Sequence, residues 1–406
     1  MHVILVEPAF PNYQRQFARG LREAGAYVTG IGERPAEWLD DELLGWLDHY
    51  DQVRSVCDEG AMLRAVQRVQ ARGWTDRLEA TVEAHMLPVA RVREAAGMPG
   101  LTVEQAILCR DKPLQKEFLR RAGVPCAAST AAASVAEVRD FIAAVGYPVI
   151  LKPRDGAGAA GTFRVDDAAG LERALRASGF ERGRSIAVEE FVEGHEGFYD
   201  TLTAGGEVVY EFISHYFPNV LPAMRDRSVS PMIIATNRLD ESTYDELKTL
   251  GRKVVAALGL GTSATHMEWF FGPKGLRFSE IGARPPGVGQ WDLYCAANGI
   301  DLYREWANAI VHGKVSRPAS REYAAGIVNL RPERDGRITG YDGLDAVRDA
   351  LGPALIDFHL PSPGTPTQSV EAGYMANAWL RARHPDYDEL RRLLDFAGDT
   401  VRVRVA

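Results

Sequence analysis

The sequence predicts an α/β protein of several domains: a parallel βαβ domain, then a two-part α+β core, then a small α+β unit at the C-terminal end. Three observations support this prediction. A length of 406 residues exceeds what one compact core usually holds. Strand-like and helix-like runs alternate over the first hundred residues, as they do in parallel sheets. Further along, strand-like runs end on charged residues beside glycines and turns.

The composition is that of a globular protein and excludes a disordered or fibrous chain, with 46% hydrophobic and 25% charged residues. The net charge is −8 and the sequence has no block of Lys and Arg, so nothing marks a surface for nucleic acid or an anionic membrane. No apolar run approaches the roughly 20 residues of a membrane span. The four cysteines are far apart and form no CxxC pair. We therefore expect a soluble cytoplasmic protein with reduced thiols and with no nucleic-acid or membrane partner.

The first domain begins with a strand at His2–Val6, which has no basic leader before it. Gln14–Ala24 repeats apolar residues at helical spacing, and Ala26–Ile31 is a second strand candidate. No GxGxxG follows the first strand, which argues against a dinucleotide-dependent oxidoreductase. The run Gly97-Met98-Pro99-Gly100 is expected to end the domain.

The next region predicts a phosphate site. A helix carrying Arg110-Asp111-Lys112 is followed by a helix at Val135–Val145 and by an apolar strand, Tyr147–Pro153. A lysine that ends an apolar strand needs an anionic partner, and glycines let backbone N–H groups approach a phosphate closely. The alternative is a structural ion pair followed by a flexible hairpin. The residues concerned are Lys152, Gly156, Gly158 and Gly161.

A second strand, Ile186–Val192, runs into the acidic stretch Glu189-Glu190-Phe191-Val192-Glu193-Gly194-His195-Glu196. Backbone groups beside Phe191 and Val192 could serve a base, and the carboxylates could serve hydroxyl groups. The alternative is a charged edge strand that enters a turn.

A predicted hairpin is the most informative feature. His266, Glu268 and Phe270 share one face of its first strand, and Glu280 lies on the returning strand. A four-residue loop would place Glu268 opposite Ser279, and a five-residue loop would place it opposite Glu280. In the second register, two carboxylates would face each other at about 5 Å and need a cation between them, which suits Mg²⁺. The first register would leave Glu268 solvated at the surface.

Two further features complete the pattern. Arg284 follows Glu280 by four residues, so an extended chain puts both on one face, where the guanidinium could stabilise charge during phosphoryl transfer. A capping or carboxylate-pairing arginine is the alternative. From about Ala324 the chain predicts a small terminal α+β unit with a hairpin signal at Asp335-Gly336.

In this order and at these separations, the features resemble the ATP-grasp superfamily of ligases, which join carboxylates to amines or thiols. The resemblance runs from about Gly97 to Gly289 and extends more weakly into the terminal unit. His266-x-Glu268 and Arg284-Pro285-Pro286-Gly287 are most similar to the branch that contains the L-amino-acid ligases. The resemblance implies an ATP-grasp fold with four domains, at residues 1–107, 108–193, 194–322 and 323–406.

The resemblance also implies a role for each site residue. The phosphates of ATP would be held by Lys112, Lys152 and the loop containing Gly156, Gly158 and Gly161. Adenine would be read at Glu190, Phe191 and Val192 with Glu189 nearby, and the ribose at Glu196. Glu268 and Glu280 would bind Mg²⁺, with Mn²⁺ able to replace it. Arg284 and Lys152 would be catalytic, together with His266 near the acceptor.

One position departs from the pattern, because many relatives have Asn where this chain has Gly282. A water or another side chain must then replace a metal ligand. Candidates for selecting the substrate are Tyr199, His215, Arg225-Asp226-Arg227, Arg331, Trp291 and Tyr294, for which core packing or a solvated loop is the alternative.

The function that the resemblance implies is an ATP-dependent carboxylate–amine ligase, which forms an amide through an acyl phosphate and releases ADP and phosphate. Its partners would be a small carboxylic acid and an amine, and the chain would form a homodimer through its first domain. The alternatives are a purine-pathway ligase or carboxylase of the same superfamily, and an ATP-binding regulator without turnover.

Overall fold

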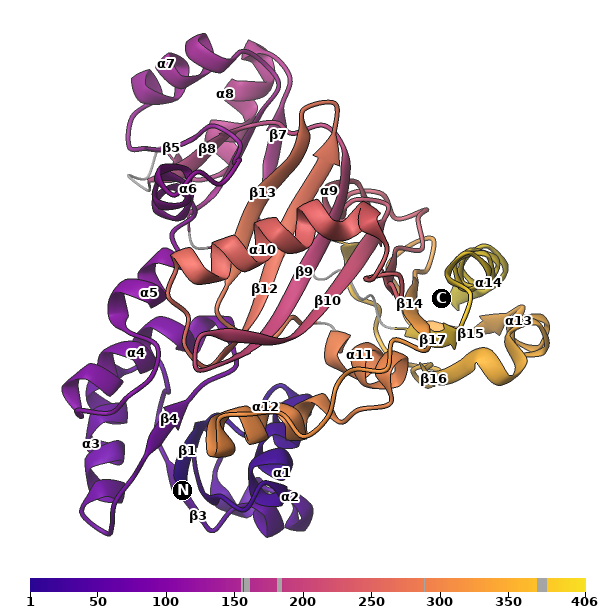
Figure 1. Ribbon diagram of the computed structural model, residues 1–406. Coiled ribbons are helices and arrows are strands. Elements are labelled where there is room, and N and C mark those ends of the chain that lie inside the picture. The colour runs from indigo at the N-terminus through magenta and orange to yellow at the C-terminus, as the bar shows by residue number, and fades with distance from the viewer. Residues whose placement is uncertain (155, 157–160, 181–184, 288, 371–377) are drawn as a thin grey trace.

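A computed structural model of the chain describes residues 1–154, 156, 161–180, 185–287, 289–370 and 378–406. Figure 1 shows the N-terminal unit at one end of a large twisted sheet, a small sheet with two helices at the other end, and the C-terminal unit at one side. No helix in these ranges is both long enough and apolar enough to cross a lipid bilayer.

The N-terminal unit has a parallel sheet in the order β3-β2-β1-β4, as the alternating sequence pattern predicts. The first strand lies where it was expected, and the first helix and second strand differ from expectation by one residue at each end. The elements are β1 (His2–Val6), α1 (Arg15–Glu23), β2 (Tyr27–Gly32), α2 (Asp41–Trp46), β3 (His49–Gln52), α3 (Glu59–Gln70), β4 (Arg77–Glu79), the short turn η3 (Glu83–His85) and α4 (Met86–Ala95).

The single helix expected around Arg110-Asp111-Lys112 is two helices, α5 (Val103–Leu108) and α6 (Lys112–Arg121). The carboxylate of Asp111 accepts the backbone N–H of Leu114 and thereby caps the start of α6. An N-cap has a non-helical backbone, so one continuous helix cannot pass through Asp111, and α6 begins directly after it.

The small sheet is antiparallel, in the order β5-β8-β6-β7, and is covered by two helices (Figure 1). The predicted helix of residues 135–145 is found with the same bounds, and the strand that carries Lys152 begins two residues later than expected. The elements are β5 (Ser129–Ala132), α7 (Val135–Val145), β6 (Val149–Pro153), β7 (Phe163–Val165), α8 (Ala168–Ala177) and β8 (Ile186–Glu190).

The large sheet is antiparallel, with the strand order β13-β12-β9-β10-β11-β14-β17-β16. It runs continuously across residue 323, from the core into the C-terminal unit, through the pairing of β11 with β14. The four-domain division stays a prediction. The elements up to β14 are β9 (His195–Ala204), β10 (Glu207–Phe217), α9 (Val220–Ala223), β11 (Met232–Ala235), the turn η5 (Ser242–Tyr244), α10 (Asp245–Ala257), β12 (Ser263–Gly272), β13 (Gly275–Gly282), α11 (Gln290–Asn298), α12 (Leu302–His312) and β14 (Ala324–Leu330).

The C-terminal unit mixes helices and strands, as expected, but Asp335-Gly336 does not join a hairpin. The strand that follows, β15, pairs with the last strand of the chain instead of with β14, because β14 already has β11 and β17 as neighbours. The elements are β15 (Ile338–Asp342), α13 (Leu344–Leu351), β16 (Leu355–His359), β17 (Ala378–His384), α14 (Tyr387–Thr400) and β18 (Arg402–Val405).

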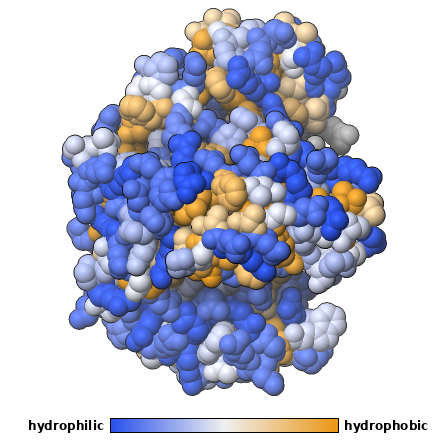
Figure 2. Space-filling model, turned by 90° about the vertical axis from the view of Figure 1, so that its right-hand side faces the viewer, coloured by the Kyte–Doolittle hydropathy of each residue, from blue (hydrophilic) through white to orange (hydrophobic). Residues whose placement is uncertain are grey.

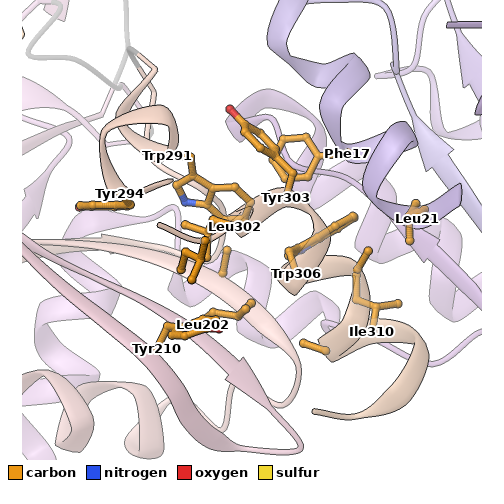
Figure 3. Close-up of a cluster of buried hydrophobic side chains, with 14 of the residues drawn as sticks. Phe17, Leu21, Leu202, Tyr210, Trp291, Tyr294, Leu302, Tyr303, Trp306 and Ile310 are labelled. Carbon is orange, nitrogen blue, oxygen red and sulfur yellow. The ribbon is translucent and has the colours of Figure 1, made fainter. Parts of the chain in front are cut away.

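The N-terminal unit is attached to the large sheet by a shared hydrophobic core. Phe17 of α1 has its ring centroid 5.1 Å from Trp291, 5.0 Å from Tyr303 and 4.9 Å from Trp306 (Figure 3). The outer surface is mostly hydrophilic on the face that Figure 2 shows, with a group of hydrophobic side chains near its centre. The aromatic core fixes how the N-terminal unit meets the rest of the chain, and therefore where its residues stand at the site.

Candidate active site

A cavity of about 750 Å³ lies where the small sheet, the large sheet and the N-terminal unit meet. It brings together the residues that the sequence singles out from five separate segments. Those lining it are Lys112, Lys152, Gly156, Glu189, Glu190, Phe191, Val192, Glu196, His266, Glu268, Glu280 and Arg284. Gly158 lies outside the described residues. Gly161 is described, with φ +67°, but does not line the cavity.

Glu268 and Glu280 face each other across the β12–β13 hairpin, in the register that a five-residue loop was expected to give. The turn is tighter than that, since Gly272 pairs with Gly275. That register alone would place Glu268 opposite Ser279. A β-bulge at Ser279 shifts the pairing by one residue, because two residues of β13 then oppose one of β12. The bulge, not the loop length, creates the carboxylate pair.

Two lysines lie against this pair. Lys112 Nζ and Lys152 Nζ are each 3.6 Å from the same Oε2 of Glu280. Burial alone would raise the pKa of Glu280, but the two lysines outweigh burial and lower it. Lys112 also donates to the carbonyl of Gly156, so it holds the beginning of the glycine-rich loop. These ion pairs link α6, β6 and β13.

Glu189 lies between two lysines. Its Oε2 is 2.6 Å from Lys116 Nζ and 2.9 Å from Lys152 Nζ. Burial favours its neutral form, but the lysines lower its pKa to about 2, so it stays ionised. The sequence analysis missed Lys116, although its position one helical turn after Lys112 placed it on the same face of α6. A part for Glu189 in binding adenine stays a prediction.

Residues of the small sheet and of β13 form an apolar slot in the cavity, beside polar backbone groups. Ile150, Phe191 and Phe278 line the cavity there, and the guanidinium of Arg164 lies 4.3 Å from the centroid of the Phe191 ring. The carboxylate of Glu190 accepts the backbone N–H of Ala128 at 3.1 Å. A slot with apolar walls and backbone groups at its edge fits a planar heterocycle.

Glu196 is the third carboxylate of the cavity. It accepts the backbone N–H of Val220 at 2.7 Å. Its pKa is raised to about 8, first by burial and then by the charges of Glu268 and Glu280. Glu196, Glu268 and Glu280 are thus three neighbouring carboxylates, and the pKa of Glu196 is raised. A cation bound among them would relieve their mutual repulsion.

The donor set fits Mg²⁺ with two protein ligands. The described residues contain no group of three or more His, Cys, Asp or Glu side chains arranged to hold a metal ion. Glu268 and Glu280 offer carboxylate oxygens from opposite strands. Mg²⁺ is commonly held by one or two carboxylates and completes its octahedron with water and substrate phosphates. The residues present therefore fit the ion when a nucleotide brings its phosphates.

His266 is oriented by a buried carboxylate that the sequence analysis did not name. Its Nδ1 lies 2.7 Å from Asp200 Oδ1, and its Nε2 lies 3.8 Å from Glu268 Oε1. Burial would lower the pKa of His266, but Asp200 outweighs burial and raises it to about 9. Tyr294 donates to the other oxygen of Asp200 at 2.5 Å. The sequence could have indicated Asp200, because side chains alternate between the two faces of a strand. Glu196, Phe198 and Asp200 therefore fall on one face.

Arg284 reaches the cavity from the end of β13 and is held by the N-terminal unit. Its Nε donates to Glu83 Oε2 at 2.6 Å, and its Nη1 donates to the Pro285 carbonyl at 2.8 Å. Arg110 donates to Glu83 Oε1 at 2.9 Å. A Cβ added at Gly282 would lie 3.1 Å from Glu83 Oε2. Glu83 thus fills space next to Gly282, the position where the family resemblance implies Asn, and no motif in the sequence indicated Glu83.

Most of the other candidates for substrate selection lie outside the cavity. Tyr199 donates to Glu211, His215 contacts His195 and Tyr244, and Arg227 pairs with Asp335. Arg331 donates to carbonyls of Ala223 and Asp226. Trp291 and Tyr294 are core residues, as the alternative interpretation held. Arg225 does line the cavity, and it donates to the Thr162 carbonyl at 3.1 Å.

Comparison with known proteins matches the middle part of the chain, which contributes much of the lining of this cavity, to a known domain. Residues 117–298 match the model of the ATP-grasp domain. An L-arginine-specific L-amino acid ligase of Bacillus subtilis is 28% identical over 273 residues, which is 66% of this chain and 65% of that protein. An uncharacterised protein of Sinorhizobium fredii is 28% identical over 70% of this chain and 59% of its own length. The match therefore spans less than two thirds of either relative.

Solved structures agree on the fold along the whole chain. The L-amino acid ligase from Bacillus licheniformis superposes with a TM-score of 0.79 at 19% identity, over 100% of this chain and 98% of that one. Phosphoribosylglycinamide synthetase from Anaerococcus prevotii gives a TM-score of 0.71 at 15% identity, over 100% and 99%. The chain has the ATP-grasp fold, with its parallel N-terminal sheet and its large antiparallel sheet.

Proposed function

We propose, on the premise that this chain is a member of the ATP-grasp superfamily, that it is an ATP-dependent carboxylate–amine ligase. It activates a small carboxylic acid as an acyl phosphate and passes the acyl group to an amine. The observation that carries the proposal is one cavity whose lining includes Lys112 and Lys152, two facing carboxylates and a half-buried arginine. These are the groups that phosphoryl transfer requires, since it depends mainly on positioning and on neutralising charge.

The lysines are assigned to the phosphates of ATP. Lys112 and Lys152 share one oxygen of Glu280, and incoming phosphate oxygens offer both lysines stronger anionic partners. Glu268 and Glu280 then hold Mg²⁺, which neutralises charge that develops on the transferred phosphoryl group. Lys116 and Glu189 fix the position of Lys152 from behind.

The apolar slot is assigned to adenine. Glu190 gives its backbone N–H to Ala128 at 2.9 Å, so its carbonyl is the group assigned to the exocyclic amine of the base. Val192 contributes its N–H, Phe191 packs against the ring, and Glu196 accepts from the ribose hydroxyls. ATP-grasp enzymes use ATP and Mg²⁺, and a complex with MgADP is known for the fold. Use of Mn²⁺ by this chain stays a prediction.

The two chemical steps balance without a side-chain nucleophile. A carboxylate oxygen of the acid attacks the γ-phosphorus of ATP, and ADP leaves with the bonding electron pair. The amine nitrogen then attacks the acyl carbon, phosphate leaves, and the amine loses a proton as the amide forms. Arg284 neutralises charge on the acyl phosphate and on the tetrahedral intermediate. His266, oriented by Asp200, lies beside Glu268 and orients the substrates.

Phosphate release with ATP, Mg²⁺ and a pooled library of carboxylic acids and amines tests the proposal, together with mass spectrometry of the products. Release that needs both an acid and an amine, with a product mass equal to their sum less water, supports it. Glu280→Gln should abolish ADP formation while the fold stays intact, because one metal ligand loses its charge. Turnover near the wild-type rate in that variant would contradict the metal assignment.

The main competing function is an ATP-binding regulator without turnover. It predicts Mg²⁺-dependent ATP binding by calorimetry and no phosphate release with any acid in the library. Lys152→Ala should weaken ATP binding under either function, and unchanged affinity would remove Lys152 from the phosphate site. A cytoplasmic location and a homodimer stay predictions.

A further inference from the structure

Beyond its charged end, the cavity has an apolar wall on the face of the large sheet. Phe198 of β9, Tyr216 of β10 and Ile233 of β11 form this wall, and all three line the cavity. The side chains of Phe198 and Tyr216 have ring centroids 5.0 Å apart, and Tyr216 pairs with Ile233 in the sheet register. These residues are between 1% and 7% exposed. We refer to them below as the apolar wall.

The apolar wall begins where the metal carboxylates end. Glu268 of β12 is the direct neighbour of Phe198 of β9, and Glu280 of β13 lies on the other side of Glu268. From β13 towards β11 the cavity face therefore changes from the carboxylates of Glu268 and Glu280 to three large, mainly apolar side chains, with Glu196 beside Phe198 on β9. Lys112 and Lys152 lie at the charged end, beside Glu280. A group that extends away from the phosphates across the sheet meets the apolar wall.

The segment around α9 covers the apolar wall. Val220 and Leu221 are half-buried and Met224 is 8% exposed, and all three line the cavity. From Phe198 to Ile233 the wall spans two strand spacings, about 10 Å, which suits an aliphatic or aromatic side chain. A charged side chain lying against these apolar side chains would lose its hydration without gaining a hydrogen-bonding or ionic partner from them.

We propose that the carboxylic acid substrate carries an apolar, aliphatic or aromatic side chain, which lies against Phe198, Tyr216 and Ile233. This inference rests on the proposed function, because that function puts the reacting carboxylate of the acid beside Glu268. The wall begins one strand spacing from Glu268, about 4.8 Å, so a side chain attached next to the carboxylate reaches it. The contact selects the acid by burying its apolar surface.

A panel of acids tests the proposal with hydroxylamine as the amine, which makes the natural amine irrelevant. L-Leucine, L-phenylalanine, L-asparagine, L-glutamate and L-lysine are compared, and 4-methylpentanoate is compared with succinate, each with ATP and Mg²⁺. Hydroxamate and ADP are the products measured. The apolar acids should exceed their polar counterparts in kcat/KM by at least about tenfold. Equal rates, or a preference for charged acids, would overturn the proposal while leaving the ligase function in place.

Two neighbouring isoleucines provide a matched pair of variants. Ile233 is on the cavity face, whereas Ile234 packs into the core under the C-terminal unit, and both are almost fully buried. Ile233→Ala should shift the ratio of phenylalanine to leucine by about fivefold, because the wall recedes. Ile234→Ala should lower the stability to a similar degree and leave that ratio unchanged. The same shift in both variants would overturn the assignment.

Binding measured without turnover separates this proposal from the ligase function. Calorimetric titration of L-leucine and of L-glutamate into the protein with ADP and Mg²⁺ should give tighter binding of leucine by about tenfold or more. If leucine binds in this way but no acid yields ADP from ATP, the ligase function fails and the apolar subsite stands. If leucine does not bind, or binds no better than glutamate, the subsite is refuted.

Discussion

The guanidinium of Arg284 is fixed by a carboxylate from a different structural unit. Glu83 of η3 accepts from its Nε, and Arg110 holds Glu83 in turn. Among the described residues, Arg284 donates its hydrogen bonds from Nε and Nη1, so we expect the N–H groups of its Nη2 to reach an acyl phosphate. Glu83 is therefore a positioning residue, which acts on the reaction through Arg284.

Replacing Glu83 tests this positioning role. Glu83→Gln keeps the size of the side chain but removes the charge that orients Arg284. We expect kcat to fall by about 10- to 100-fold with little change in the KM for ATP, since roughly 1.4 kcal/mol of lost transition-state stabilisation lowers a rate tenfold. Steady-state ADP formation at varied ATP concentration measures both parameters.

Glu79 provides a matched control for this prediction. It is a buried glutamate of the same unit, whereas Glu83 is half-buried, and it pairs with Arg77 at 2.7 Å and Arg93 at 3.3 Å. Glu79→Gln should lower the thermal stability without changing kcat. A comparable loss of kcat in both variants would mean that Glu83 acts through the fold and not through Arg284.

At the scale of elements, a glutamine side chain attaches α6 to β13. The amide of Gln115 accepts the backbone N–H of Ile281 at 3.0 Å and donates to the Ile281 carbonyl at 2.7 Å. It thus pairs with the strand edge as another strand would. Ile281 directly follows Glu280, and Gln115 lies on α6 together with Lys112. The contact therefore fixes the position of Glu280 relative to Lys112.

Gln115→Met should lower the free energy of unfolding by about 2–4 kcal/mol, because it leaves a buried N–H and a buried carbonyl of Ile281 without partners. Denaturant unfolding measures the change. Gln70→Met is the control: Gln70 is half-buried and donates one bond, to the Ala96 carbonyl at 3.2 Å, and its loss should cost less than about 1 kcal/mol. Equal losses would contradict the role of Gln115 as a strand mimic.

A pair of histidines, buried His215 and half-buried His195, joins β9 to β10 and predicts a pH dependence of stability. His215 Nδ1 lies 2.9 Å from His195 Nε2, its Nε2 lies 2.9 Å from the Tyr244 hydroxyl, and Arg391 contributes positive charge. Burial, His195 and Arg391 lower the pKa of His215 to about 3. The unfolded chain therefore binds a proton that the folded chain does not, at every pH between about 3 and the ordinary histidine value of 6.5.

The free energy of unfolding should accordingly be largest above pH 6.5 and fall as the pH decreases. Between pH 6.5 and pH 5.0, His215 should account for about 2 kcal/mol of the loss. In His215→Gln, which retains hydrogen-bonding groups but does not titrate, this part of the loss should be absent. Denaturant unfolding at both pH values decides the matter, and identical pH slopes for the two proteins would refute the assignment.

At the scale of the whole molecule, the N-terminal unit completes the cavity, so its attachment to the core matters for function. Helices α1 and α12 pack closely at Gly20, where an added Cβ would lie 2.5 Å from the Tyr303 carbonyl oxygen. Phe17, on the same helix, is enclosed by aromatic side chains of α11 and α12 (Figure 3). The close approach positions the unit that carries Glu83 and Tyr13 at the cavity.

Gly20→Ala should destabilise the protein by about 1–3 kcal/mol, because the helices must separate to admit the methyl group. Gly45 of α2 is the control, since an added Cβ there meets nothing within 4 Å. Gly45→Ala should be neutral or stabilise by about 0.5 kcal/mol, because alanine favours helix. Thermal unfolding of both variants tests the packing, and ADP formation measured at 25 °C tests its link to activity. A Gly20→Ala protein of unchanged stability would contradict the close packing of α1 on α12.

Local patterns in the sequence determined much of this protein. The parallel strands of the N-terminal unit, the helix at residues 135–145, and the strand ending in Lys152 follow from apolar spacing and from breaks at glycine and proline. Twelve of the residues that line the cavity were also named from the sequence as site residues, because side chains with chemical roles stood at the ends of such elements. Their individual roles stay predictions. These features depend on neighbours within a few residues, so a single sequence contains them.

The tertiary structure alone decided the remainder. The bulge at Ser279 that pairs Glu268 with Glu280 depends on how β13 meets its neighbours, and the hairpin sequence allowed either register. Glu83 comes to Arg284 from about 200 residues away in sequence, through the packing of α1 on α12. The apolar wall takes one residue from each of three strands. Such contacts join segments that are distant along the chain, and no local spacing encodes which segments will meet.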